Sequence, residues 1–346
     1  MTDTPFLSLS AGDRRDALAV AERAGARRAH ILEKDIWIVL VLHVLYDAPF
    51  ARELVFKGGT SLAKAYGAIR RFSEDVDITR DIRALAPDLA AGAGVDPLPA
   101  TRSQERRWTR TIRDRLATWI RDCARPEVEQ RLASAGLRAR VHADGELLLV
   151  VYDPLFEEYG FVRPEVRVEF GARSTGGPHE RRPVVCDAAT CLPGLSFPTA
   201  RPSVMRAERT FWEKATAMHV FCRQERRRGQ RQSRHWHDVV RLDDAGFAAR
   251  ALADRTLAHS VARHKAMFFA EKDTTGTWID YEAAVRGTLQ LVPEGDARAA
   301  LADDYGRMLA DGMLLDDGES FASIIDRCAD LETRANPLTA DEGIDR

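Results

Sequence analysis

The sequence predicts an α/β domain over residues 1–200, followed by an all-helical domain over residues 201–346. Three observations support this division. Short segments of the first half alternate polar and apolar residues, as half-buried strands do. Segments in which apolar residues recur at helical spacing separate these strands. From Ser203 onward the spacing stays helical and indicates no strand, so we place the boundary near residue 200.

The elements are expected in a simple order. We predict helices at 12–28, 36–46, 62–69, 101–137 and 203–222, strands at 54–56, 75–78, 147–152, 165–170 and 183–186, and loops or turns at 85–100 and 174–181. The helix at 101–137 is basic, and an apolar stripe indicates its buried face: Trp108, Ile112, Leu116 and Ile120. The last ten residues are polar and expected to be loose.

Composition limits the class of protein. A chain of 346 residues with 45% apolar residues suits two ordinary cores, and a net charge of −2 gives no overall field for nucleic acid. The five Cys lack zinc or redox spacing, which favours reduced thiols in the cytoplasm. There is no signal-peptide pattern, and the longest apolar run, Ile36–Tyr46, is too short to cross a bilayer. We therefore expect a cytoplasmic protein without a membrane partner.

A glycine turn follows the strand predicted at 54–56. Gly58 and Gly59 end this strand, and either Thr60 or Ser61 is suited to cap the helix that follows. Backbone amides at such a strand-to-helix turn suit a phosphate group. Lys57 directly precedes the turn, and only six of the 51 basic residues in the chain are Lys. Because most basic residues of the chain are Arg, a Lys at this position is a candidate for a specific contact with phosphate.

Two carboxylates come next in the sequence. Asp75 and Asp77 alternate with apolar residues, so a strand would present both from the same face. Two acids held in this way suit a divalent metal ion with oxygen ligands. A phosphate-binding turn followed by metal-binding carboxylates is the equipment for transferring a nucleotide or a phosphoryl group.

Two further residues are candidates for the same chemistry. Glu169 lies on the polar side of the strand predicted at 165–170. If that strand neighbours the one with the two aspartates, three carboxylates converge and hold two Mg²⁺ ions. The alternative is a solvated strand face on which Glu169 pairs with Arg167. Lys214 lies at the edge of an apolar helical stripe, which suits either a nucleotide phosphate or a structural ion pair with Glu208 or Glu213.

The last candidate is Asp238, which would order Lys214 or accept a proton. It follows His235 and His237, whose spacing raises the alternative of a zinc site. The residues after them continue as a helix, and no third ligand has convincing spacing. The segment 223–234 just before carries six Arg, and it suits equally a solvated loop or a contact with RNA phosphates.

Taken together, these segments resemble the AbiEii/AbiGii family of nucleotidyltransferase toxins, which belong to the DNA polymerase β-like nucleotidyltransferase superfamily. Two blocks, Phe-Lys-Gly-Gly-Thr-Ser-Leu-Ala-Lys-Ala-Tyr and Arg-Phe-Ser-Glu-Asp-Val-Asp-Ile, are the most specific. Further blocks agree in order along the chain, at 33–37, 168–173, 213–214 and 234–238. The chain departs from the family pattern in a longer gap between the glycines and Asp75, and in having His at 235 and 237.

The resemblance implies a polymerase β-like domain with a small mixed sheet, and a toxin of a toxin–antitoxin or abortive-infection system. It implies transfer of a nucleotide from an NTP with two Mg²⁺ ions, onto tRNA or another RNA, which blocks translation. It also implies a cognate antitoxin, of which a transcriptional regulator is one form. Carried over by position, the resemblance implies that Asp75, Asp77 and Glu169 bind the metal. It implies that these three take part in catalysis together with Lys214 and Asp238. The residues implied to bind the nucleotide are Lys57, Gly58, Gly59, Thr60, Ser61 and Lys214.

Two alternatives use the same residues. One is transfer of a nucleotide onto a protein hydroxyl, for example on an antitoxin. The other is a catalytically inactive regulator that binds an NTP without turnover. The intact pair of acids argues against the second alternative, because a decayed site tends to lose its acids.

Overall fold

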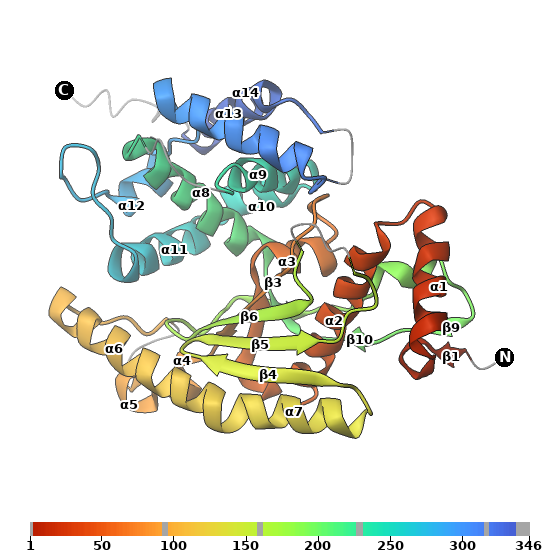
Figure 1. Cartoon of the computed structure of the whole chain (residues 1–346). Coiled ribbons are helices and arrows are strands. Elements are labelled where there is room, and N and C mark those ends of the chain that lie inside the picture. The colour runs from red at the N-terminus through yellow and green to blue at the C-terminus, as the bar shows by residue number, and fades with distance from the viewer. Residues whose placement is uncertain (1–2, 92–95, 158–161, 226–230, 315–317, 337–346) are drawn as a thin grey trace, which may run out of the picture. The chain divides into compact units, whose positions relative to one another are not determined.

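The computed structural model describes residues 3–91, 96–157, 162–225, 231–314 and 318–336. The chain forms two compact units (Figure 1). Unit 1 comprises Met1–Tyr66, Ser73–Pro97 and Arg106–Met205, and unit 2 comprises Gly67–Phe72, Leu98–Glu105 and Arg206–Arg346. Two short segments of the first half thus belong to the second unit. The predicted loose tail at 337–346 and the centre of the Arg-rich segment, 226–230, lie outside the described residues.

Unit 1 is built on a seven-stranded sheet with the strand order β4-β5-β6-β3-β2-β11-β7. Its strands are β2 (Leu54–Lys57), β3 (Asp75–Arg80), β4 (Ala139–Asp144), β5 (Leu147–Tyr152), β6 (Glu165–Gly171), β7 (His179–Arg181) and β11 (Ser203–Met205). β3 runs parallel to β6 and antiparallel to β2, and β11 runs parallel to β2. The predicted α/β class and mixed sheet are confirmed.

Helices and short strands complete unit 1. They are α1 (Ala11–Arg23), α2 (Ala29–Tyr46), α3 (Gly58–Lys64), α4 (Ile82–Leu85), α5 (Pro87–Ala90), α6 (Arg102–Trp119) and α7 (Arg125–Ser134), with β1 (Thr4–Pro5) paired to β9 (Leu195–Ser196) and β8 (Val184–Val185) paired to β10 (Thr199–Ala200). The first turn of α6, up to Glu105, belongs to unit 2. A π-helical turn, Ile120–Ala124, joins α6 to α7, so the basic helix predicted at 101–137 is confirmed as one nearly continuous helical run.

One face of the sheet is apolar and forms the core of unit 1. Val76, Ile78, Val168 and Phe170 lie on this face and are buried. Aromatic rings of the neighbouring helices cover it: Trp119 meets Phe170 edge-on, with ring centroids 5.5 Å apart. The stripe predicted on the basic helix is buried as expected. The opposite face of β3 and β6, here called the polar face, carries Asp75, Asp77, Arg167 and Glu169.

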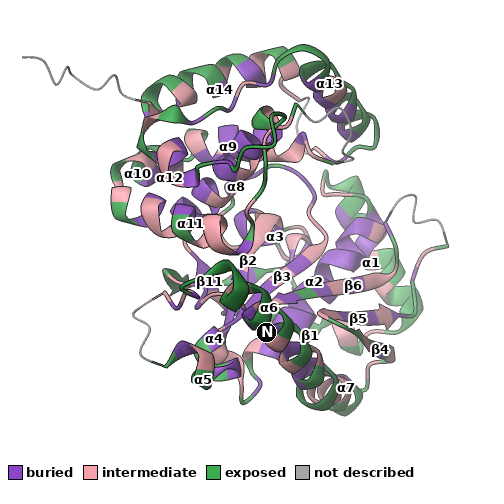
Figure 2. Ribbon diagram, turned by 90° about the vertical axis from the view of Figure 1, so that its left-hand side faces the viewer, coloured by how far each residue is buried: buried purple, intermediate pink, exposed green. Residues whose placement is uncertain are grey.

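Every named element of unit 2 that begins after Met205 is a helix: α8 (Ala207–Arg223), α9 (Arg234–Asp244), α10 (Phe247–Ala253), α11 (Arg255–Phe268), α12 (Tyr281–Ala283), α13 (Gly295–Ala310) and α14 (Phe321–Ala335), with a π-helical turn at Ala284–Thr288. Residues of α8 and α9 make up much of its core, and Figure 2 colours both helices largely as buried. Among the described residues, no helix has both the length and the apolar character needed to cross a bilayer.

Several predicted boundaries are wrong. α3 begins at Gly58, before Thr60, and ends at Lys64, so the helical spacing at 62–69 does not mark a helix along its whole length. Ser203 begins a strand, β11, and the helix follows only at Ala207. The loop expected at 85–100 contains α5, the turn at 174–181 contains β7, and β4 has no counterpart in the prediction. Tertiary pairing decides these short elements, because their own sequences are too brief to do so.

Candidate active site

The two predicted metal ligands lie on the polar face of the sheet. Asp75 and Asp77 share one face of β3, and the register of the sheet places Asp77 opposite Lys57 on β2 and opposite Glu169 on β6. Paired residues on neighbouring strands present their side chains to the same face. The condition that the sequence set for Glu169, a strand adjacent to that of the aspartates, is therefore met. Lys57 and the three predicted carboxylates thus share this face of unit 1.

Gly58 lies directly against the Asp77 side chain. Its φ of +78° is in the left-handed region, which a residue without Cβ adopts at little cost. A Cβ at this position would stand 2.0 Å from Oδ2 and 2.8 Å from Cγ of Asp77. Conformation and space both require glycine here. The backbone of the turn consequently approaches the carboxylate as closely as any residue type allows.

The hydroxyls of the turn hold its own structure together. Thr60 Oγ1 donates to the carbonyl oxygen of Asp75 at 2.5 Å and lies 3.0 Å from Ser73 Oγ. Ser61 Oγ donates to the carbonyl oxygen of Gly58 at 2.9 Å. Both side chains are fully buried. The turn is thus tied to the first residue of β3, and its shape is fixed relative to the aspartates.

Arg167 lies among the acids of the polar face. Its guanidinium nitrogens are 3.8 Å from Asp75 Oδ1, 3.7 Å from Glu165 Oε1 and 3.9 Å from Glu169 Oε1. These distances are longer than hydrogen bonds, and the side chains of Arg167 and Glu169 are 38% and 52% exposed. Arg167 therefore balances the charge of several carboxylates loosely instead of pairing tightly with one of them.

This donor set fits a divalent metal ion with oxygen ligands. No group of three or more His, Cys, Asp or Glu side chains in the described residues is arranged to hold a metal. Mg²⁺, however, is commonly held by one or two carboxylates together with substrate phosphates instead of a cage made only of protein. Asp75 and Asp77 would supply such a pair, and Glu169 lies on the adjacent strand.

The other two predicted catalytic residues meet each other in unit 2. Lys214 Nζ lies 2.8 Å from Asp238 Oδ2, and both side chains are almost completely buried. Arg71 donates two hydrogen bonds to the same carboxylate, from Nε at 2.7 Å and from Nη2 at 2.8 Å. Two cations thus share one buried carboxylate. The structural partners predicted for Lys214 pair elsewhere, Glu208 with Arg250 and Glu213 with Arg209.

Burial and charge act in opposite directions on this cluster. Burial disfavours ionisation of Asp238, but the adjacent Arg71 and Lys214 hold its pKa well below the usual value of 3.8. Burial lowers the pKa of Lys214, and Arg71 adds to that effect while Asp238 opposes it. His237 Nδ1 is 3.4 Å from Asp238 Oδ1. Burial, reinforced by Lys214, lowers the pKa of His235 well below 6.5.

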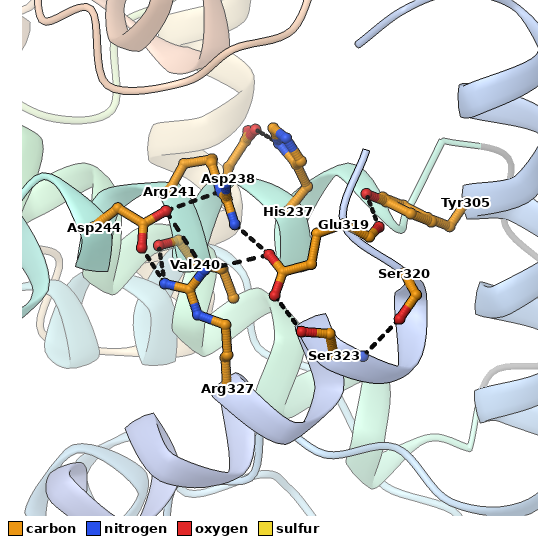
Figure 3. Close-up of polar contacts among 10 residues, drawn as sticks. All are labelled: His237, Asp238, Val240, Arg241, Asp244, Tyr305, Glu319, Ser320, Ser323 and Arg327. Carbon is orange, nitrogen blue, oxygen red and sulfur yellow. Dashed lines mark hydrogen bonds and ion pairs between the residues drawn. The ribbon is translucent and has the colours of Figure 1, made fainter. Parts of the chain in front are cut away.

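The helix that carries Asp238 is tied to α14 by a polar network (Figure 3). Arg241 of α9 pairs with Glu319, which also accepts a hydrogen bond from Ser323. Arg327 of α14 bridges Glu319, at 3.2 Å, and Asp244 at the end of α9. The residues after His237 continue as a helix, as predicted, and α9 includes both histidines, so His235 and His237 lie on different sides of it.

Most of the chain matches a known family. The family described as nucleotidyl transferase AbiEii toxin, type IV TA system, matches residues 40–327. The chain belongs to this family. It is a nucleotidyltransferase toxin of a type IV toxin–antitoxin system. The solved structure of MenT4, a nucleotidyltransferase toxin from Mycobacterium tuberculosis, is similar with a TM-score of 0.48 and 19% identity over 97% of this chain and 92% of that one. A search of curated proteins found no match.

Sequence reasoning missed Arg71. No periodicity distinguishes it from its neighbour Arg70, and its partner Asp238 is 167 residues away in the sequence. The contact of Gly58 with Asp77 was also missed, although the glycine itself was singled out. A glycine pair followed by an acid pair is the signal that could have suggested it, because glycine often marks a close approach to the backbone.

Proposed function

We propose that this AbiEii toxin transfers a nucleotide from an NTP to an acceptor hydroxyl on RNA, with tRNA as the first candidate, and so blocks translation in the cytoplasm. The observation that supports this most strongly is the arrangement on the polar face of unit 1. There, Asp77 pairs in register with Lys57 on one side and Glu169 on the other, and the backbone of Gly58 lies against its carboxylate.

Each residue of that face has a proposed task. Asp75, Asp77 and Glu169 would hold the metal, and Lys57 would bind a phosphate of the NTP as a compact cation. Two Mg²⁺ ions bound there would activate the attacking oxygen and neutralise the triphosphate. The backbone at Gly58 and Gly59 would face the phosphates. Thr60 and Ser61 would contribute by holding the turn, since their hydroxyls bond within it.

The proposed reaction is an in-line displacement at the α-phosphorus of the NTP. The oxygen of the acceptor hydroxyl forms the new bond to phosphorus and loses its proton to solvent. The bond from that phosphorus to the bridging oxygen of the β-phosphate breaks, and pyrophosphate leaves. Negative charge builds up on the phosphate oxygens in the transition state, so positive groups that are already in place around them lower the barrier most.

Lys214 and Asp238 have a separate place in the proposal. Their ion pair belongs to unit 2, and Asp238 also holds Arg71. We propose that Lys214 contacts phosphate and that Asp238 orients it. A buried Lys with a lowered pKa is a frequent feature of functional sites, although structural ion pairs show it too. Replacing Lys214 by an apolar residue of similar length therefore separates the two roles.

A labelling experiment tests the proposal. The purified protein is incubated with each of the four NTPs, labelled at the α-phosphate, together with Mg²⁺ and either total RNA or total protein. We expect label in the RNA fraction, and in tRNA after size separation. Asp75→Asn and Asp77→Asn should abolish labelling and growth inhibition while circular dichroism stays unchanged. Full activity of both variants contradicts the mechanism. Label in the protein fraction would favour the alternative acceptor, and binding of NTP without any label would favour an inactive regulator.

A further inference from the structure

Unit 2 carries one exposed surface that the proposed reaction does not use. It lies on the connection between α11 and α12, which Figure 1 shows as a loop beside these helices. Trp278 of this connection is 59% exposed and Phe269 is 44% exposed. All six Trp of the chain fall within the described residues, and the other five are at most 8% exposed. Trp278 is thus the one Trp that the fold leaves in solvent.

The connection is a hydrogen-bonded hairpin and not a loose loop. The backbone N–H of Ile279 donates to the carbonyl of Glu271 at 3.0 Å, and Trp278 forms a β-bridge with Lys272. Asp273 Oδ1 accepts hydrogen bonds from the backbone N–H groups of Thr275 and Thr277 inside the turn. These contacts fix the backbone that carries Trp278. Because a Trp side chain has only two torsions, it loses little conformational entropy when a ligand packs on it.

Cations accompany both exposed rings. Lys272 Nζ is 5.0 Å and Arg102 Cζ is 5.3 Å from the centroid of the Trp278 ring. Arg102 belongs to unit 2 and also donates to the carbonyl of Met267 at 2.7 Å. Lys265 Nζ is 5.0 Å from the centroid of the Phe269 ring. Two of the six Lys in the chain therefore lie beside exposed aromatic rings.

We propose that this surface, formed by Arg102, Lys265, Phe269, Lys272 and Trp278, binds unpaired nucleotides of RNA. Aromatic faces stack on bases that are not paired, and nearby cations meet the phosphates. The choice of RNA over DNA rests on the proposed function. Aromatic residues and Arg are common at protein interfaces too, but Lys is depleted there, and here a Lys ammonium lies over each ring. Three acids lie in the same connection and are engaged elsewhere. Asp273 pairs with Arg223 at 2.8 Å, Glu271 accepts a hydrogen bond from Gln224, and Asp280 caps α12 by accepting from the backbone N–H of Ala283.

Direct binding tests this inference without any transfer reaction. The full chain is titrated, without NTP or metal, with a labelled single-stranded RNA of about 12 nucleotides and with a duplex of the same sequence. We expect the single strand to bind more tightly and to quench intrinsic fluorescence. Trp278→Ala should weaken binding about ten-fold or more and remove the quenching, since stacking on an aromatic ring carries a large share of the affinity for single strands. Trp278→Phe should restore most of the binding.

Matched variants separate charge from stacking. Lys272→Gln should make the slope of log K against log salt shallower by about 0.7, the contribution of one phosphate contact in a single strand. Leu309→Ala, which trims an exposed apolar residue elsewhere in unit 2, should bind as the wild type does. Asp77→Asn should also bind RNA normally while losing nucleotide transfer, so failure of the proposed reaction and failure of this surface are distinguishable.

Four results would overturn the inference: unchanged RNA affinity in Trp278→Ala, equal affinity for single strand and duplex, no binding of RNA by the wild type, or tighter binding to single-stranded DNA than to RNA. Quenching of Trp278 by an acidic peptide or by anionic vesicles, without quenching by RNA, would assign the surface to another kind of partner and would equally overturn it.

Discussion

Gly58→Ala is expected to disable the enzyme through a single atom. The added Cβ would lie 2.0 Å from Asp77 Oδ2, 2.8 Å from Cγ and 3.0 Å from Cβ of the same residue. Atoms in contact prefer a separation of about 3.5 Å or more, so the carboxylate would have to move by roughly 1.5 Å. Rotating the Asp77 side chain relieves the first two contacts only. The third involves a Cβ that the backbone of β3 fixes.

The expected magnitudes follow from these contacts. A left-handed backbone costs a residue with a Cβ about 1–2 kcal/mol, and forcing an extra methyl into a filled space costs about 1–3 kcal/mol more. Displacing a catalytic group by more than about 1 Å costs on the order of 100-fold in rate. We therefore expect Gly58→Ala to lose roughly 2–5 kcal/mol of unfolding free energy in urea and about 100-fold in nucleotide transfer.

A second glycine provides the control. Gly145, in the turn between β4 and β5, has a φ of +56°, and a Cβ added there would meet no described atom within 4 Å beyond its neighbours in the chain. Gly145→Ala should therefore show the backbone cost of about 1–2 kcal/mol without the contact cost, and should keep full activity. Combined with Asp77→Ala, Gly58→Ala should cost less than it does alone, because the carboxylate it displaces is gone. Equal stability and equal activity of Gly58→Ala and Gly145→Ala would refute the argument.

Three other predictions follow from charges. Asp238→Asn leaves Arg71 and Lys214 buried without their carboxylate, so the free energy of unfolding in urea should fall by about 3–5 kcal/mol. Lys214→Met should fold but lose nucleotide transfer. Full transfer by Lys214→Met would show that the ion pair is purely structural. Arg167→Gln should tighten Mn²⁺ binding about five-fold, as measured by electron paramagnetic resonance. The Arg167 cation lies near 4 Å from a partly exposed carboxylate and opposes metal binding there by about 1 kcal/mol. Unchanged Mn²⁺ affinity would contradict this. Burial, together with Arg223, lowers the pKa of His219 from 6.5 to about 4. As the pH falls, the unfolded chain therefore binds the proton first, and the free energy of unfolding should fall by about 3 kcal/mol from pH 7 to pH 4. His219→Asn should flatten this pH dependence.

The sequence was a good guide where chemistry follows from local periodicity. Asp75 and Asp77 are two residues apart, so any strand through them puts both on one face. The alternation around Glu169 likewise predicted its face. What periodicity could not supply was the pairing of β3 with β6, because these strands lie far apart in the sequence and their register depends on the whole sheet.

Short elements with long-range partners were the harder part. β11 has only three residues, and it is a strand because it fits between β2 and β7, not because its residues favour one. The role of Arg71 is equally hidden, because its partner carboxylate, Asp238, lies far along the chain. A single sequence offers no local pattern for such pairs.

The first turns of α2 show how a polar motif can serve the site without touching it. Glu33, Lys34 and Asp35 are consecutive and buried, and each has a different partner. Lys34 Nζ pairs with Glu74, the residue before Asp75, at 3.0 Å. Asp35 pairs with Lys64, the last residue of α3, at 2.5 Å. Since a buried charge is tolerated only where its partner is held in place, α2 fixes the chain both where α3 ends and where β3 begins. The two ends of the segment between the glycine turn and the aspartates are thereby anchored to one helix, which explains why three charges open an otherwise apolar helix.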